Sequence, residues 1–383
     1  MYAKRKSLRG SKRSAKSSTS RSSHYRRKRY TRKPRLSGPR PIPKFLAAQV
    51  NPFDPQVRGV RVPDENTAPS SSFHTYDQCS IGALASTANG TESNRLSMIL
   101  FTPAVYQYGV VPTNNVDTNT TSQVTWSTTS WTTGGLIPDK FTQVSAAYSV
   151  CRPVAHGIRI CCPLKPTEAQ GFLHIALMTV SMRAQIGPGD NNGAAVAVPN
   201  TISRMRELPH YRRVTLASLT QEPLVVTNRF LDQTAFRYSD VGTNDLATQT
   251  TPGGNHVPLS WMCILVAVES HNQTAGTSLA VVENITHYEG QSRPDALNQD
   301  DSPEPTEPDH FDGTAATISA FPACWTNSEF SNAVQTASNG FFNWLVKHGR
   351  RGIAMGVASA VSWTTQRALT GRGLPGVNTG RSM

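Results

Sequence analysis

The sequence predicts an all-β protein whose body is a single eight-stranded jelly-roll sandwich. Three observations predict this fold. Strand-like runs recur between residues 73 and 290 without a long helical pattern between them. Gly (27) and Pro (26) are plentiful and only 16% of residues are charged, which suits many short strands joined by turns. Two runs, GFLHIALMTVSM and WMCILVAV, are apolar at nearly every position, as expected of strands buried on both faces.

The first 40 residues form a cationic arm with sixteen Lys or Arg and no Asp or Glu. The rest of the chain holds 22 Lys or Arg against 25 Asp or Glu, so the arm accounts for the positive net charge. A Ser-rich, self-repelling segment with few apolar side chains is expected to be disordered when free. Its natural partner is a polyanion, above all nucleic acid. The candidate nucleic-acid-binding residues are Lys4, Arg5, Lys6, Arg9, Lys12, Arg13, Lys16, Arg21, Arg26, Arg27, Lys28, Arg29, Arg32, Lys33, Arg35 and Arg40.

Residues 41–72 form a Pro-rich lead-in that we expect to run extended over a surface. The shell domain follows over residues 73–290. Its expected strands are residues 73–83, 95–101, two strands within 141–162 that break near Pro153, 171–182, 211–219, 222–226, 235–238, 261–268 and 278–288. A helix also fits the period of 261–268, but its shortness and Pro258 favour a strand. The long polar stretches at 112–139, 187–200 and 239–256 are expected to be surface loops.

The C-terminal part of the chain changes character twice. Residues 291–329 form an acidic connecting segment, in which 291–312 hold seven Asp or Glu against one Arg. Residues 330–383 are basic, and the apolar residues of 330–345 and 353–369 recur at helical spacing. Two interpretations are open: a pair of amphipathic helices docked on the body, or a basic amphipathic peptide that meets nucleic acid or a lipid surface.

Several functional classes lack support in the sequence. There is no G-x-x-x-x-G-K-[ST], H-E-x-x-H or G-x-S-x-G motif, so no turnover enzyme is indicated. No run reaches the length of a membrane span, and no secretion signal is expected. The six cysteines have no zinc-binding spacing and are expected to be mostly buried, reduced thiols. His174 is expected to be a strand residue rather than a ligand, and Asp300 and Asp301 a solvated charge run.

Three segments together resemble a known family. They are NPFDPQVRGVRVPDEN at 51–66, YSVCRPVAHGIRICCP at 148–163 followed by GFLHIALM, and FSNAVQTASNGFFNWLVKHGRRGIAMGVASAVS at 330–362. In this order they resemble the capsid proteins of nodaviruses, especially insect nodaviruses, and the related capsids of diatom-infecting single-stranded DNA viruses. The third segment resembles the nodavirus cleavage junction and the membrane-active peptide after it.

The resemblance implies a structural protein of the virion that lies in the host cytoplasm or nucleus during assembly. Roughly 180 copies would form a T=3 icosahedral shell. The arm would package a single-stranded genome, RNA or DNA, and the C-terminal region could meet a host membrane. No cofactor is implied, although calcium ions could lie between subunits.

The resemblance also implies a single-turnover self-cleavage at Asn332-Ala333, the one Asn-Ala pair of the chain. The Asn332 side-chain nitrogen would attack its own carbonyl carbon, forming a cyclic imide and releasing Ala333 as a new N-terminus. A buried carboxylic acid with a raised pKa would shuttle protons. Asp64 matches the family's acid by its place in Val62-Pro63-Asp64, with Asp77 in reserve. The sequence departs from the pattern after Asp64, because Glu65-Asn66 replaces an Arg-aromatic pair.

Two alternative interpretations stay open. Asp64 could simply cap a turn, and Ser331 or Asn332 could cap the helix that begins there. The whole chain could instead be a nuclear nucleic-acid-binding β-sandwich protein with a basic tail, since RRKR at 26–29 would serve as a nuclear localisation signal. The large β body without a DNA-reading element favours the capsid interpretation.

Overall fold

The computed structural model describes residues 42–64, 68–82, 95–112, 116–117, 124–126, 135–179, 198–241, 260–270, 277–294 and 308–348. Residues 1–41 lie outside these ranges. The expected arm, the expected helix at 353–369 and Asp300 with Asp301 therefore lie outside the described residues, as do most of the three long loops.

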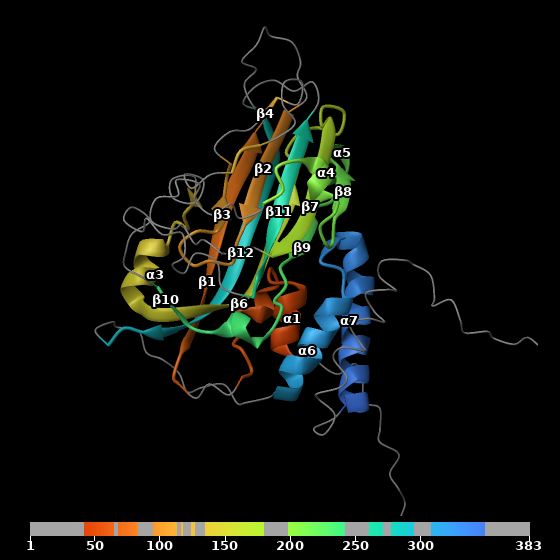
Figure 1. Ribbon diagram of the computed structural model, residues 1–383. Coiled ribbons are helices and arrows are strands. Elements are labelled where there is room, and N and C mark those ends of the chain that lie inside the picture. Colours follow the sequence, from red (N-terminus) through yellow and green to blue (C-terminus); the bar gives the residue numbers. More distant parts are fainter. Residues whose placement is uncertain are drawn as a thin grey trace, which may run out of the picture. The chain divides into compact units, whose positions relative to one another are not determined.

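Two antiparallel sheets form the body (Figure 1). The first sheet has the order β1 (Ser71–Gly82), β12 (Ser278–Ser292), β6 (Tyr148–Cys161), β9 (Leu224–Thr227) and β13 (Cys324–Thr326). The second has the order β5 (Gly135–Leu136), β3 (Gly109–Val110), β2 (Arg95–Phe101), β11 (Met262–Ser270), β7 (Gly171–Thr179) and β8 (Arg212–Thr215). Two short strands pair at the side, β10 (Ser239–Asp240) with β6 and β4 (Val116–Asp117) with β2.

The connectivity is that of a jelly roll. Eight principal strands can be counted from first to eighth in chain order: β1, β2, β6, β7, β8, β9, β11 and β12. The first sheet then joins the first, eighth, third and sixth, and the second sheet joins the second, seventh, fourth and fifth. This double Greek-key order distinguishes a jelly roll from other sandwiches. The predicted fold class is confirmed.

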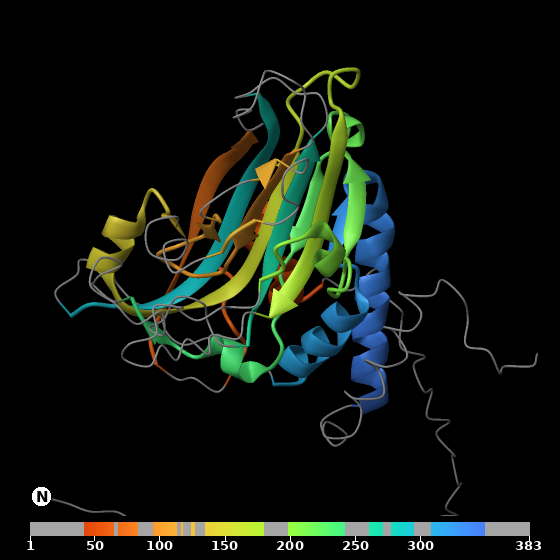
Figure 2. The same cartoon turned by 45° about the horizontal axis from the view of Figure 1, so that its top comes forward.

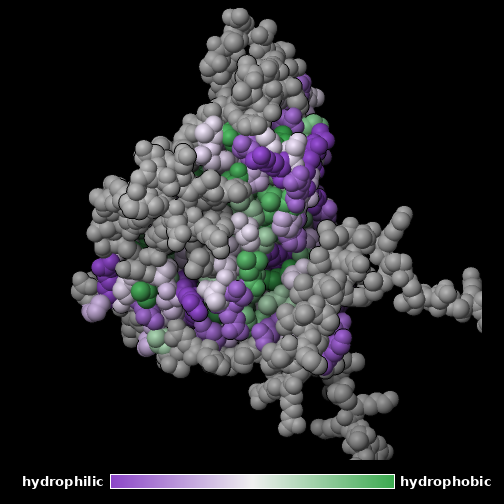
Figure 3. Space-filling model, viewed as in Figure 1, coloured by the Kyte–Doolittle hydropathy of each residue, from purple (hydrophilic) through white to green (hydrophobic). Residues whose placement is uncertain are grey.

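Apolar residues fill the space between the sheets and also cover the outer face of the second sheet. Alternate residues of β7, such as Leu173 and Ile175, point into the sandwich, and their neighbours Ala176 and Met178 pack outward against Val124. Figure 3 shows apolar residues in the middle of one face of the molecule, between hydrophilic margins. Burial on both faces explains why nearly every position of β7 and β11 is apolar.

A layer of three helices covers the outer face of the first sheet. It consists of α1 (Lys44–Val50), α6 (Pro308–Ala320) and α7 (Asn327–His348), and we call it the helical layer. Phe45, Phe311 and Phe341 pack in one cluster with Val154 of β6 and Val225 of β9. Figures 1 and 2 show α6 and α7 side by side in both views. No helix of the described ranges is long and apolar enough to span a membrane.

The helical layer corrects two expectations. The lead-in was expected to be extended, but residues 44–50 form α1, and a short 3₁₀ turn, η1 (Pro55–Val57), follows. The segment 291–329 was expected to be only a connection, but it contains α6 and β13. In both cases apolar side chains become buried against distant parts of the chain, and this burial stabilises short helices that local propensity alone would not.

The segment 141–162 also differs from expectation. It begins with a helix, α3 (Phe141–Ala147), and continues as the single strand β6 through Pro153. The register of β6 against β12 shifts between His287 and Tyr288, beside Pro153. Proline has no N–H group to donate to the neighbouring strand. At a bulge the ladder of backbone hydrogen bonds is interrupted, so Pro153 fits there and the strand does not break.

Two shorter segments expected as strands are helical as well. Residues 235–238 overlap the 3₁₀ turn η2 (Gln233–Phe236), and the end of 211–219 forms α5 (Leu216–Leu219). Both turns are capped at their N-termini, by Asp232 and Thr215 respectively. One further short helix, α4 (Ile202–Met205), lies beside β7. All six cysteines are free, and four of them, Cys151, Cys162, Cys263 and Cys324, are buried.

Candidate functional site

The elements that adjoin the two cationic ends in the sequence both belong to the helical layer. Helix α1 begins at Lys44, four residues after Arg40, the last cation of the arm. Helix α7 ends at His348, and the cationic tail follows it. Because α6 packs against both α1 and α7, these two helices belong to one layer on one face of the sandwich.

A buried ion cluster holds the lead-in to the first sheet. Arg152 of β6 is 2% exposed, and its guanidinium donates to both Asp64 and Glu289. Its Nη2 lies 2.8 Å from Glu289 Oε2 and 3.2 Å from Asp64 Oδ1, and its Nη1 lies 3.1 Å from the Phe236 carbonyl oxygen. The ring of Tyr238 lies 4.5 Å from the guanidinium carbon. Burial lowers the pKa of Arg152, but the hydrogen bond to Asp64 and the charge of Glu289 outweigh it and raise that pKa overall.

Further hydrogen bonds extend this cluster along the lead-in. The Ser70 hydroxyl donates to Glu289 Oε1 at 2.6 Å, and the Val62 amide donates to Glu289 Oε2 at 3.3 Å. Arg61 Nη2 donates to the Ser70 carbonyl oxygen at 2.7 Å. The chain on both sides of residues 65–67 is therefore fixed to β6 and β12 by charge-assisted hydrogen bonds.

The residues expected to cleave the chain lie in three different places. Asp64 belongs to the ion cluster. Asn332 is exposed on α7, where its carbonyl oxygen accepts from Thr336 Oγ1 at 2.8 Å, and Ala333 is buried in the helical layer. Asp77 is buried on β1, and burial raises its pKa. β1 and β13 are the opposite edges of the first sheet, and α7 packs against β13, so the chain does not bring Asp77 to Asn332.

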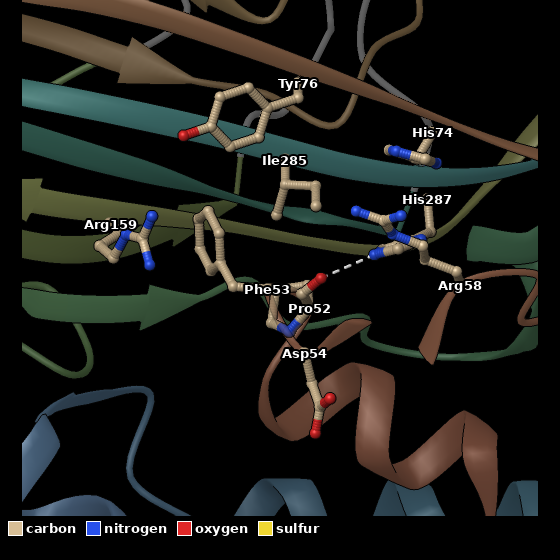
Figure 4. Close-up of a pocket in the computed structure, with 9 residues that line it drawn as sticks. All are labelled: Pro52, Phe53, Asp54, Arg58, His74, Tyr76, Arg159, Ile285 and His287. Atoms are coloured by element: carbon tan, nitrogen blue, oxygen red, sulfur yellow. Dashed lines mark hydrogen bonds between the residues drawn. The ribbon is translucent and has the colours of Figure 1, made fainter. Parts of the chain in front are cut away.

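Sequence reasoning missed a cavity of about 330 Å³ on the outer face of the first sheet. Its lining residues come from four segments that are far apart in the sequence, so no local sequence motif predicts the cavity (Figure 4). They are Pro52, Phe53, Asp54, Arg58, His74, Tyr76, Arg159, Ile285 and His287. His287 Nε2 lies 2.7 Å from the Pro52 carbonyl oxygen, which ties the segment after α1 to β12.

His174 is a strand residue of β7, as predicted, and it is fully buried. One ring nitrogen lies 2.8 Å from the Tyr211 hydroxyl, and the other lies 3.3 Å from Glu269 Oε2. Both nitrogens of the imidazole therefore have partners from the protein. In the described part of the chain, no three His, Cys, Asp or Glu side chains gather as metal ligands would.

Comparison with solved structures finds virus particles. The chain is similar to the T13 particle of infectious bursal disease virus, with 10% identity, a TM-score of 0.44 and coverage of 79% of this chain and 96% of that one. It is similar to T=1 particles of the same virus, with 11% identity, a TM-score of 0.44 and coverage of 82% and 96%. Cocksfoot mottle virus shows 9% identity, a TM-score of 0.33 and coverage of 57% and 92%. No family model and no curated protein matches the sequence.

Proposed function

We propose that this chain is the coat protein of an icosahedral virus and that its cationic arm packages a single-stranded genome. One observation supports this above all: in a jelly-roll body, the helices next in sequence to the two cationic ends, α1 and α7, belong to the same helical layer. A shell with this layer on its inner side would gather the cations of every copy around the enclosed polyanion.

The charge of the body supports the same arrangement. Residues 41–332 hold 16 Lys or Arg against 25 Asp or Glu, so the body repels polyanions as a whole. Binding is then concentrated at the ends of the chain. Contacts from an extended cationic arm go to phosphates, which makes packaging largely independent of sequence.

Expression of the full chain tests this function. We expect uniform closed shells in negative-stain micrographs, with an absorbance ratio at 260 and 280 nm that reports enclosed nucleic acid. Chains that remain monomeric at all salt concentrations would contradict the proposal, and so would shells that enclose no nucleic acid.

The finer features come from the nodavirus resemblance and remain proposals. They are a T=3 shell of roughly 180 copies, self-cleavage at Asn332-Ala333, and a membrane-active C-terminal region. Ala333, Ala337, Phe341 and Trp344 form the buried face of α7. Contact with a membrane through α7 would therefore require this helix to leave the helical layer. Cleavage would require α7 to open at Asn332, because a helical backbone holds that peptide bond in the hydrogen-bonded ladder.

A further inference from the structure

The cavity of Figure 4 has a cationic end. Arg58 follows η1, His74 belongs to β1 and His287 to β12, and in the figure these three side chains gather at one side. The centroids of the two imidazole rings lie 5.7 Å apart. The charges of Lys44 and Arg58 act on His287, and those of Arg58 and Lys140 act on His74. Within the described ranges, Arg58 and Lys44 are exposed and form no ion pair.

The carboxylates near the cavity do not neutralise this end. Asp54 accepts from the Gln56 amide at 2.9 Å as the cap of η1, and Figure 4 shows its carboxylate turned away from the imidazoles. Glu283 is paired with Arg159. An anion entering beside Arg58 and His74 would therefore meet donors that are not paired with either of these carboxylates, while the Nε2–H group of His287 is engaged by the Pro52 carbonyl oxygen.

The other end of the cavity is aromatic. The Tyr76 side chain is 49% exposed, which is unusual for so large an apolar ring on a sheet. Phe53 lies under the Arg159 guanidinium, with 5.0 Å between the guanidinium carbon and the ring centroid. Ile285 lies between the two ends in Figure 4. Exposed aromatic faces next to cations are the usual platform for an unpaired base.

We infer that this cavity binds one nucleotide of the packaged single strand, with its phosphate at Arg58 and His74, beside His287, and its base against Tyr76 and Phe53. The inference rests on the proposed function, because the ligand is the enclosed genome. The cavity lies on the sheet face that also holds the helical layer, and Pro52 and Phe53 directly follow α1. A strand bound by the arm would thus have a fixed contact on the body.

Burial and the neighbouring cations favour neutral imidazoles while the cavity is empty. They lower the pKa of His74, and they lower the pKa of His287 to about 4. A neutral imidazole has one N–H group: that of His74 can donate to a phosphate oxygen, whereas that of His287 donates to the Pro52 carbonyl oxygen.

Photo-cross-linking tests the inference on the full chain. Shells are assembled with an oligouridylate that contains 4-thiouridine and are then irradiated, and the cross-linked peptides are mapped by mass spectrometry. We expect adducts on the peptide that contains Tyr76 in addition to adducts on the arm. The Arg58→Ala/His74→Ala variant should lose the Tyr76 adduct by at least about tenfold, the loss expected when roughly 1.4 kcal/mol of binding is removed, while the arm adducts persist.

Matched variants keep the outcome interpretable. Arg204→Ala removes an exposed cation from α4, beside β7 of the second sheet, and should leave all adducts unchanged. The single variant Arg58→Ala changes an exposed side chain, so shells should form normally, as negative-stain images would show.

Each further result overturns something specific. Adducts on the arm alone would overturn the nucleotide cavity and leave packaging intact. The absence of adducts on both would overturn the proposed function as well. Binding of inorganic phosphate can be followed by ³¹P NMR, as a signal change that the wild-type protein produces and the Arg58→Ala/His74→Ala variant does not. Such a change without any Tyr76 adduct would assign the cavity to free phosphate instead.

Discussion

The Arg152 guanidinium pairs with the Asp64 carboxylate, which lies 88 residues earlier in the sequence. The pair joins the lead-in to the central part of the first sheet, and Glu289 shares the same guanidinium. The segment that connects the cationic end of the chain to the sandwich is thus fixed by ionic contacts as well as by the burial of α1.

Removal of Arg152 should destabilise the protein strongly. Arg152→Met leaves Glu289, whose side chain is 5% exposed, as a buried charge without its main partner. The expected loss is about 3–5 kcal/mol in the free energy of unfolding. Urea unfolding followed by tryptophan fluorescence measures it.

Two controls frame that prediction. Asp64→Asn should cost less, because the Asp64 side chain is 32% exposed. Glu168→Gln breaks an exposed pair with Lys165 and should change stability by less than about 0.5 kcal/mol. An Arg152→Met protein as stable as the Glu168→Gln protein would show that the cluster contributes little.

Deletion of residues 2–35 should yield shells that enclose little or random nucleic acid, because 15 of the sixteen arm cations are removed. The ratio of absorbance at 260 and 280 nm measures the content of purified shells. A variant that keeps the arm's length but replaces its Lys and Arg by Ser and Gln separates charge from length. Normal genome content in either variant would refute packaging by the arm.

Truncation of Phe341 should loosen the helical layer. Phe341 is 1% exposed, and the contact of α6 with α7 is close, since a methyl group added at Gly313 would lie 3.0 Å from the Phe341 ring. Phe341→Ala should cost about 3–5 kcal/mol and speed proteolysis within α7. Asn343→Ala, on the exposed side of the same helix, is the control. Equal proteolysis rates in the two variants would place the docking energy elsewhere.

Self-cleavage predicts a difference between free and assembled chains. The unassembled protein should stay full length, because α7 holds Asn332 and Ala333 in a helix. Mature shells should contain a second fragment that begins at Ala333, and Asn332→Ala should abolish it. Mass spectrometry measures the chain masses in both samples. If mature shells contain only the full-length chain, the cleavage proposal is refuted.

Stability should fall with acid through His156. This imidazole is buried between Asn284 and Asn228, 2.8 Å from Asn284 Oδ1 and 3.1 Å from Asn228 Nδ2. Burial lowers its pKa from 6.5 to about 4. The unfolded chain therefore binds the proton first, so stability is present above pH 6.5 and declines as the pH falls toward 4.

Unfolding free energies measured at pH 7 and pH 5 check this prediction. The decline from one fully coupled proton is about 1.4 kcal/mol per pH unit. His156→Gln should be less stable at pH 7 and should show a smaller decline. An unchanged pH dependence in that variant would mean that other groups, such as His210 or His287, dominate the acid response.

Much of the fold could be predicted because strands leave a local signal. The run at 95–101 coincides with β2, and the alternating or continuous apolar patterns of 261–268 and 278–288 mark β11 and β12. The candidate sites were less accessible. Asp64 was chosen as a catalytic acid from its dipeptide, yet its partner Arg152 could be found only from the folded chain.

The sequence by itself determined the class of fold and the separation of charge, because periodicity and composition are properties of neighbouring residues. Only the tertiary structure decided where α1 and α6 form, which carboxylate meets Arg152, and that Arg58, His74, Arg159 and His287 line one cavity. These features depend on strand order and register. The jelly-roll connectivity places the first and the eighth strands side by side, which no local pattern encodes.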